Sequence, residues 1–451
     1  MKYFVTISLT RIIALSFAVC CFFTLNAQET GISPYSRIGL GDMNLYHSPG
    51  YASMAGASVS LSDFNMVNIS NPASLSSLSP HMPVFELSGT SQFLKLTSEN
   101  SSANLNSTNF TRMSIALPVN NKLGLALGIK PFTTSGYNIT TTNNEPSIGN
   151  VTYLYQGKGG VNNLFLSGGY SLIQSDSISL SLGASVNFLF GNIDKTRRVE
   201  FPDDATALNS KLTQKTSYSG VDFQMGLLFK QRVSQSIKYS LGVSYSLGTK
   251  LNATREDFFG TYTNFSSVEV IQDTLQYFSE NKGKVVVPSS LSLGGSVNFN
   301  NNLDIAVQYN RQDWASYEEI FDQNSVTDTL ATSSSLAVGI RYRPTDVFST
   351  AKFYERIEYR AGFRTGNSSL QFDNNQLTEF GTSFGLGIPL RKSATSKNEF
   401  RSLSMFHVGV EMGRRGNNEN GLIQENFTTV YFGISIMPQV QNRWFVKRKF
   451  K

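Results

Sequence analysis

Few residues of this chain have the types and spacing that catalysis needs. The 451 residues include three histidines, His47, His81 and His407. His407 and Glu411 are four positions apart, so they share one face if this stretch is a strand. A hydrolase would need a serine within hydrogen-bond reach of such a histidine, but serine is too common here to be informative. We therefore interpret His407 and Glu411 as a polar pair that faces an interior.

Other kinds of chemistry have no support in the sequence. It contains no glycine-rich phosphate loop, no metal-ligand spacing and no paired-cysteine motif. Its glycines fit sheet curvature and internal space better than nucleotide binding. The formal net charge of +6 is small and scattered, so no nucleic acid partner is implied. We predict a protein that is not an enzyme, with no cofactor and no metal site.

The N-terminus has the layout of a secretory signal peptide. Lys2 and Arg11 precede an apolar run over residues 12–25, and residues 25–27 (Leu-Asn-Ala) offer a small-residue cleavage site. We therefore expect residues 1–27 to be removed on export. The alternative is an anchor that stays in the membrane, but the apolar run is short for a membrane span.

Both cysteines lie inside this signal. Cys20 follows Val19 and Cys21 follows Cys20, whereas a lipoprotein signal would want a small residue before the modified cysteine. The mature chain would then contain no disulfide and no thiolate metal site. No run of about 18 apolar residues follows the signal, so no transmembrane helix is expected. If the mature protein lies in a membrane, a closed barrel remains, because lipid offers no partners to an open sheet edge.

A period of two in hydropathy dominates the chain from residue 82 onward. In residues 177–188 every even position is apolar, and the odd positions are Ser, Gly or Asn. This period belongs to a strand with one apolar and one small polar face. Because so many strands repeat it, we infer that the apolar faces meet lipid and the polar faces meet a lumen, as in outer-membrane barrels.

The pattern predicts an all-β fold, a transmembrane antiparallel barrel of about 14 strands. The expected strands lie near residues 82–96, 109–119, 121–134, 160–174, 177–193, 214–232, 236–254, 285–299, 302–313, 332–343, 355–366, 377–390, 401–414 and 427–438. The connections after the second, fourth, sixth and eighth strands are tiny, whereas those after the third, fifth, seventh and ninth are long and polar. Short periplasmic turns alternating with long outer loops predict the outer membrane of a Gram-negative cell.

The segment before the first strand has a different character. Residues 28–81 contain short runs of Gly, Ser, Pro and Asn without a sustained period of two. A fourteen-stranded barrel has room for a plug, so we predict an N-terminal hatch over residues 28–81 and a barrel over residues 82–438. Residues 439–451 form a basic aromatic tail, which we interpret as a solvated terminus or a periplasmic contact.

The hatch segment carries a resemblance to a known family. Residues 53–63 contain an Ala-Gly-Ala run, and the stretch ends at Asp63. Residues 68–75 contain Asn71-Pro72-Ala73. These stretches resemble the hatch of the outer-membrane transporters for long-chain fatty acids and aromatic hydrocarbons, the FadL/TodX type. Weaker similarities occur in the barrel, at residues 288–294, 313–314, 360–363 and 384–387.

The resemblance implies a monomeric barrel of fourteen strands whose hatch closes the lumen. Apolar compounds would enter from outside, bind in the lumen, and leave sideways through a gap at a kinked third strand that Asn71, Pro72 and Ala73 contact. Pro131 gives the third strand a reason to kink, since proline removes a ladder donor. We therefore place the gate at Asn71, Pro72, Ala73, Pro131 and Phe132, although the strand could also simply end at Pro131.

Two functions from different classes are favoured over a structural or general porin role. The first is passive uptake of hydrophobic compounds such as long-chain fatty acids. The second is an accessory or shuttle of a type IX protein secretion system, a role that barrels of this kind also serve. The expected partners are hydrophobic small molecules, outer-membrane lipid, the barrel assembly machinery and, for the second function, secretion-system components. An apolar cavity with a lateral gap would favour the first function, and a lumen sealed by polar contacts would favour the second.

Overall fold

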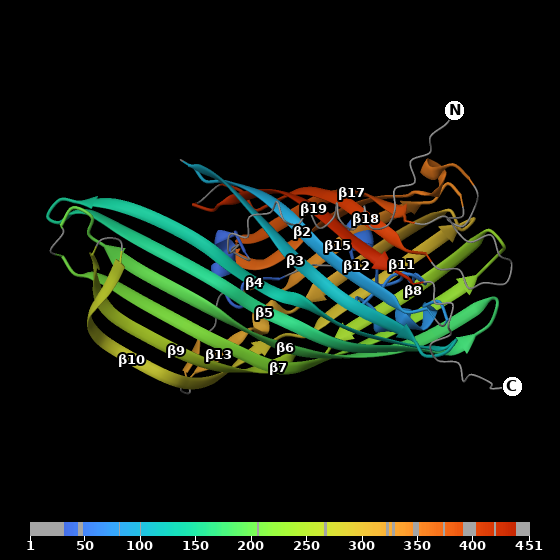
Figure 1. Ribbon diagram of the computed structural model, residues 1–451, viewed down its shortest axis with the longest axis horizontal. Helices are drawn as coiled ribbons and strands as arrows, with labels where there is room; N and C mark the ends of the chain where they lie inside the picture. Colours follow the sequence, from blue (N-terminus) through green and yellow to red (C-terminus); the bar gives the residue numbers. More distant parts are fainter. Residues whose placement is uncertain are drawn as a thin grey trace, which may run out of the picture.

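A computed structural model describes residues 31–438, apart from residues 44–47, 81, 100, 205–206, 266–267, 322–323, 327–329, 346–350, 373–374, 391–402 and 419–420. The chain forms one closed antiparallel barrel of 14 strands, so the predicted fold class is confirmed (Figure 1). The barrel closes where β19 pairs with β2. Its strands, in spatial order, are β2 (Val84–Thr97), β3 (Ser102–Pro118), β4 (Leu123–Glu145), β5 (Gly149–Gln174), β6 (Ile178–Glu200), β7 (Asn209–Arg232), β8 (Ile237–Ser246), β11 (Ser290–Phe299), β12 (Leu303–Gln312), β15 (Ser333–Tyr342), β16 (Glu358–Phe372), β17 (Asn375–Pro389), β18 (Met405–Arg415) and β19 (Gln424–Ile436).

The two faces of each strand differ as the hydropathy pattern predicts. In β6, Val186 and Phe188 are exposed on the outer face, whereas Ser185 and Asn187 are buried on the inner face. The predicted tight turns are also present, and Asn300 and Asn301 adopt positive φ values of 52° and 60° between β11 and β12. Asparagine tolerates this left-handed conformation better than most residues. Among the described residues, no helix is long and apolar enough to cross a membrane.

Several strands are longer than the sequence pattern predicts. The third strand was expected to end at residue 134 but continues as β4 to Glu145, and residues 255–284, expected to be an outer loop, form most of β9 (Thr249–Phe265) and β10 (Val268–Val287). The physical reason is that a strand outside the lipid needs no apolar outer face. The hydropathy period therefore disappears where the lipid ends, although the hydrogen-bonded ladder continues.

These extensions form an open sheet beyond the barrel wall. The outer half of β7 pairs with β9 instead of β8, and β9 pairs with β10. Figure 1 shows β4–β7, β9 and β10 reaching well past the ends of β2, β3 and β15–β19. Near the barrel, residues 283–286 of β10 pair with β13 (Glu318–Phe321). β13 in turn pairs antiparallel with β14 (Asn324–Val326).

Residues 31–79, called the inner segment below, pack against the inner face of the barrel. Their elements are short: η1 (Pro34–Arg37), β1 (Asp42–Met43), α2 (Pro49–Ala52) and η2 (Pro72–Ser77). Met54, Ala57, Val67, Asn71 and Ala73 are fully buried. Two further short helices, η3 (Trp314–Ser316) and η4 (Phe353–Arg356), lie in connections between barrel strands.

Candidate functional site

Glycines on the barrel wall form the seat of the inner segment. Gly124, Gly169, Gly183 and Gly226 stand opposite one another on β4, β5, β6 and β7. A Cβ atom at any of them would come within 2.1–2.4 Å of an inner-segment atom. Across the barrel, Cβ atoms at Gly362, Gly385 and Gly409 would come within 2.2–2.4 Å of Ser53 or Met54. These positions lack side chains where the inner segment lies directly against the wall.

The structure places Asn71, Pro72 and Ala73 of the predicted gate against β5–β7 and not beside Pro131. The Asn71 side chain donates to the Leu227 carbonyl of β7 at 2.9 Å and to Val59 at 2.8 Å, and Ala73 lies over Gly183 of β6. These contacts hold η2 across β5–β7. At η2 the inner segment meets β4 at Gly124, where Leu75 and Leu78 lie, seven positions before Pro131.

The β3–β4 ladder of the barrel wall is nevertheless interrupted beside Pro131, and this interruption is called the gap below. Within the described chain, the ladder between β3 and β4 ends at the pair Met113–Ile129, although both strands continue. The strand does not end at Pro131; a register shift lies between Pro131 and Thr133, where β4 bends against β5. From this point outward, β3 pairs only with β2.

The inner segment covers the edge of β4 in this gap. Its short strand β1 pairs with β4, with Met43 opposite Thr133 and Asp42 opposite Thr134. Arg415 of β18 binds the Asp42 carboxylate at 2.9 and 3.1 Å. The residues that meet the kinked strand beyond Pro131 therefore include Asp42, Met43 and Ser36, which bonds Ser135 and Gly136. The sequence motif indicated none of them.

An apolar cluster lines the lumen beside the gap. Phe132 of β4 and Met43 pack against it from the gap side, and Leu40 belongs to it. The other members come from the outer parts of the barrel: Val161, Leu189, Ile193, Tyr218, Leu251, Ala253, Val285, Val287, Trp314, Tyr317 and Phe321. Most of its members lie inside the predicted strands and three follow β12, but the inner faces of those strands are mainly Ser and Gly, so the sequence pattern gave no sign of the cluster.

The cavities near the inner segment are polar. A cavity of about 300 Å³ is lined mainly by Ser, Asn and Gln side chains, with Met43, Lys130 and Trp314 on its wall. A second, of about 390 Å³, lies near the short turns and is lined by Asp63, Lys230, Arg341 and further polar residues. The interior thus combines a packed apolar cluster with polar spaces.

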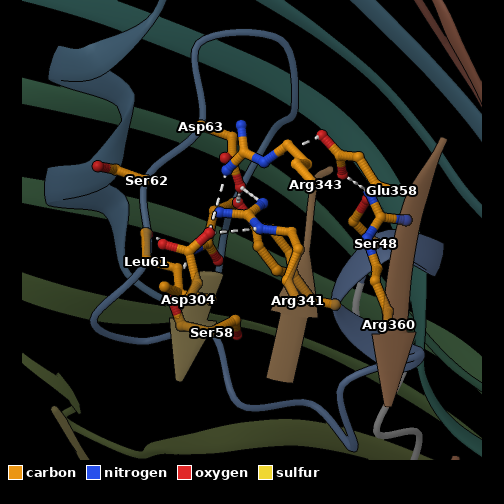
Figure 2. A network of polar contacts seen from close by, with 12 residues as sticks. Ser48, Ser58, Leu61, Ser62, Asp63, Asp304, Arg341, Arg343, Glu358 and Arg360 are labelled. Carbon is orange, nitrogen blue, oxygen red and sulfur yellow. Dashed lines mark hydrogen bonds and ion pairs between the residues drawn. The ribbon is translucent and has the colours of Figure 1, made fainter. Parts of the chain in front are cut away.

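Buried ion pairs connect the inner segment to the part of the barrel wall formed by β12, β15 and β16 (Figure 2). Arg341 binds Asp63 of the inner segment at 2.8 Å and Asp304 of β12 at 2.9 Å. Arg343 joins Asp304 at 3.0 Å and lies 3.7 Å from Glu358, which also pairs with Arg360. The three carboxylates and three guanidinium groups balance in charge, and such balance is what permits burial.

Asp63 is the inner segment's charged contact in this network. The Tyr51 hydroxyl donates to its carboxylate at 2.7 Å. Burial by itself raises the pKa of Asp63, but the guanidinium groups of Arg341 and Arg343 outweigh burial and hold that pKa below its usual range. Asp63 therefore stays ionised, and its bond to Arg341 persists, at any physiological pH.

A second buried pair holds the inner segment at the edge of the gap. Arg112 lies one residue beyond the last β3–β4 ladder pair and is 1% exposed. It pairs with Glu86 of β2 at 3.3 Å and donates to the Val67 carbonyl at 3.1 Å. Glu86 also accepts from the Val67 amide at 3.0 Å. Val67 of the inner segment is thereby bound through its carbonyl by β3 and through its amide by β2.

His407 and Glu411 both face the lumen from β18 but belong to different networks. His407 contacts Arg360 and Ser435, each at 3.0 Å, and Glu411 pairs with Arg364 at 2.7 Å. The other two histidines lie outside the described residues. No group of three or more His, Cys, Asp or Glu side chains in the described part of the chain could hold a metal ion.

Comparison with solved structures places this barrel among hydrocarbon channels in fold. The monoaromatic hydrocarbon channel CymD has a TM-score of 0.54 at 12% identity, over 89% of this chain and all of that one. The Pseudomonas putida toluene transporter TodX gives 0.55 at 14%, over 89% and 100%. The Ralstonia pickettii toluene transporter TbuX gives 0.52 at 14%, over 86% and 98%.

Sequence comparisons give a family. A search of curated protein sequences finds no match to this chain. The family model described as BamG matches residues 9–451, nearly the whole length. The chain therefore belongs to the BamG family.

Proposed function

We propose that this protein is an outer-membrane channel through which small apolar compounds pass sideways, by the gap between β3 and β4. The observation that carries the proposal is the end of the β3–β4 ladder at Met113 and Ile129, next to the apolar cluster. A compound that reached the cluster from outside would find Phe132 and Met43 between itself and the gap. The inner segment acts as the hatch in this proposal, and β1 acts as the movable seal.

The substrate class follows from the cluster's chemistry. Its members are aliphatic and aromatic, so they favour compounds without charge. Compounds the size of toluene suit a cluster that is packed and must open locally. The solved neighbours named for toluene and monoaromatic hydrocarbons support this choice, and long-chain fatty acids remain the second substrate to test.

A disulfide across the seal tests the proposal. Met43 and Thr133 are directly opposed in an antiparallel ladder, where Cα atoms about 4.5–5.5 Å apart lie within disulfide reach. The variant Met43→Cys/Thr133→Cys should take up labelled toluene or oleate only after reduction. A Leu336→Cys/Thr365→Cys pair, opposed between β15 and β16, is the control and should show no redox effect. Equal uptake by the oxidised and reduced seal variants would refute the lateral route.

A second candidate function is a partner role in protein export or outer-membrane protein assembly. The observation that favours it is that polar contacts hold the inner segment to opposite sides of the barrel. These are the Asp63–Arg341 ion pair and the hydrogen bond from Arg112 to the Val67 carbonyl. A barrel closed in this way could serve as a scaffold, and the family name BamG points toward the barrel assembly machinery. A deletion strain in which export or barrel assembly falls while uptake of apolar compounds is unchanged would establish this function instead.

A further inference from the structure

The outer part of β10 is a strand edge with no neighbour. Within the described residues, β10 pairs with β9 along its length but with β13 only over Gly283–Val286. Residues 268–278 therefore expose one row of backbone amides and carbonyls. Such a row is complementary to one kind of ligand, another extended polypeptide.

Apolar side chains gather on this edge. Leu275 is 56% and Tyr277 is 60% exposed. The other exposed apolar residues of the same stretch are Val268, Val270, Ile271 and Phe278. Lone exposed apolar residues are ordinary, but a contiguous set on an open edge marks an interaction site.

Lipid does not cover this set, because the lipid-facing belt ends well below it. On β7 the outward residues Met225, Phe223 and Val221 are apolar, whereas Ser219, Ser217 and Lys215 farther out are exposed and polar. Tyr277 lies opposite Phe258, and Phe258 lies opposite Thr213 of β7. At about 3.3 Å per residue, Thr213 is roughly 25 Å along the strand beyond Val221. The exposed apolar edge is therefore in water, on the outer side of the membrane.

The geometry points to a short extended segment of a separate polypeptide as the occupant. Two copies related by a twofold axis along the membrane normal would place their β10 edges parallel, which is the slightly less stable pairing. Pairing β10 with the outer edge of β4 in a neighbouring copy would be head-to-tail, which gives a closed assembly only if the rotation between copies completes a ring. Three register shifts, between Ile271 and Asp273, between Thr274 and Gln276, and between Phe278 and Asn281, divide the edge into short runs.

We propose that β10 binds such a segment by strand addition, with apolar side chains at alternate positions that cover Leu275 and Tyr277. The bulges suit a short strand and disfavour indiscriminate pairing with a whole sheet. The partner acts from the cell exterior. This binding does not depend on whether the lateral gap conducts apolar compounds.

Peptide binding to the full-length barrel in lipid nanodiscs tests the proposal. The probe is a fluorescent twelve-residue peptide that alternates Val or Ile with Thr or Lys, and its control carries N-methyl groups on alternate amides. We expect saturable binding of the probe only. Leu275→Lys/Tyr277→Lys should weaken it at least tenfold, since charges on an edge oppose strand addition. Ile148→Lys, at an exposed residue in the β4–β5 turn of the same rim, should leave it unchanged.

Three results would overturn the proposal. The first is the absence of saturable binding by wild-type protein, and the second is equal binding of the N-methylated peptide. The third is a disulfide-linked dimer that a Tyr277→Cys variant forms in membranes and that adding Leu275→Lys abolishes. Such a dimer would assign the edge to a second copy of this chain. Heat-modifiable gel mobility of every variant shows that the barrel has assembled, so a loss of binding reports on the edge itself.

Discussion

Replacing Gly183 with alanine should loosen the inner segment without opening the barrel. The new Cβ would lie 2.2 Å from the Ala73 amide nitrogen and 2.3 Å from the Pro72 carbonyl carbon. Ordinary contacts are more than 1 Å longer, and both opposing atoms are backbone, so no side chain can rotate away. Overpacking of this kind costs about 1–3 kcal/mol. The strain falls on η2, because β6 is held by full ladders on both sides.

Hydrogen exchange of residues 72–78 measures this loss directly. Because each 1.4 kcal/mol is a factor of ten, a cost of about 1–3 kcal/mol should speed exchange there by about 5- to 150-fold. Gly295→Ala is the matched control, since its Cβ would meet only a Leu241 methyl group at 3.7 Å. Equal protection of residues 72–78 in wild type, Gly183→Ala and Gly295→Ala would refute the idea that the wall glycines seat the inner segment.

Four further substitutions test the buried polar contacts. Arg112→Met should lower the free energy of unfolding by about 3–5 kcal/mol in a urea titration, because Glu86 is left buried and unpaired. Adding Glu86→Met should recover part of this loss. A double variant no more stable than Arg112→Met would contradict the importance of the ion pair. Tyr51→Phe should cost about 1.5–3 kcal/mol by the same titration, since its hydroxyl donates to a carboxylate. Asp63→Asn should lower stability at neutral pH by a similar amount. Because the folded pKa of Asp63 lies below its unfolded value, its contribution to stability is fully present above about pH 4 and is lost as the pH falls further. The stability advantage of wild type over Asp63→Asn should therefore vanish in acid. A constant difference down to pH 2 would contradict the ion pair with Arg341.

The barrel could be predicted because lipid and lumen impose opposite demands on alternate residues. The stretch 177–188 shows this clearly, and it lies in β6 as expected. The same reasoning failed beyond the lipid, where both faces of β9 and β10 meet water or the lumen and no alternation is required. Their pairing rests on backbone hydrogen bonds, which leave no hydropathy signature. The sequence pattern therefore indicated the number of strands but not their length.

The site was harder to predict than the fold. The hatch residues were expected inside the barrel, and Asn71 and Ala73 are buried there, but the wall they contact could not be deduced. Asn71 binds the backbone carbonyl of Leu227, and every strand offers such carbonyls. The charged residues gave a better signal, since Arg112 and Asp304 occupy inward positions where a lone charge would be costly. Their partners could not be inferred, because Asp63 and Arg341 are 278 positions apart.

The two ways in which the inner segment is held suggest which part of it moves. Around η2 and α2 it lies against glycines and buried ion pairs, so displacing it would expose several unpaired charges at once. Its contact with β4 at the gap consists of two ladder positions and the hydrogen bonds of Ser36 with Ser135 and Gly136. The Asp42–Arg415 pair supports it, and the Asp42 side chain is 26% exposed. Water can replace the ladder bonds and the Asp42–Arg415 pair at little cost, whereas the buried Ser36 bonds need a new partner. In the proposed lateral route, opening of the gap therefore requires release of Asp42, Met43 and the Ser36 contacts with β4, while η2 and α2 stay in the glycine seat. A lateral route of this kind would admit apolar compounds to the membrane without ever opening an aqueous pore.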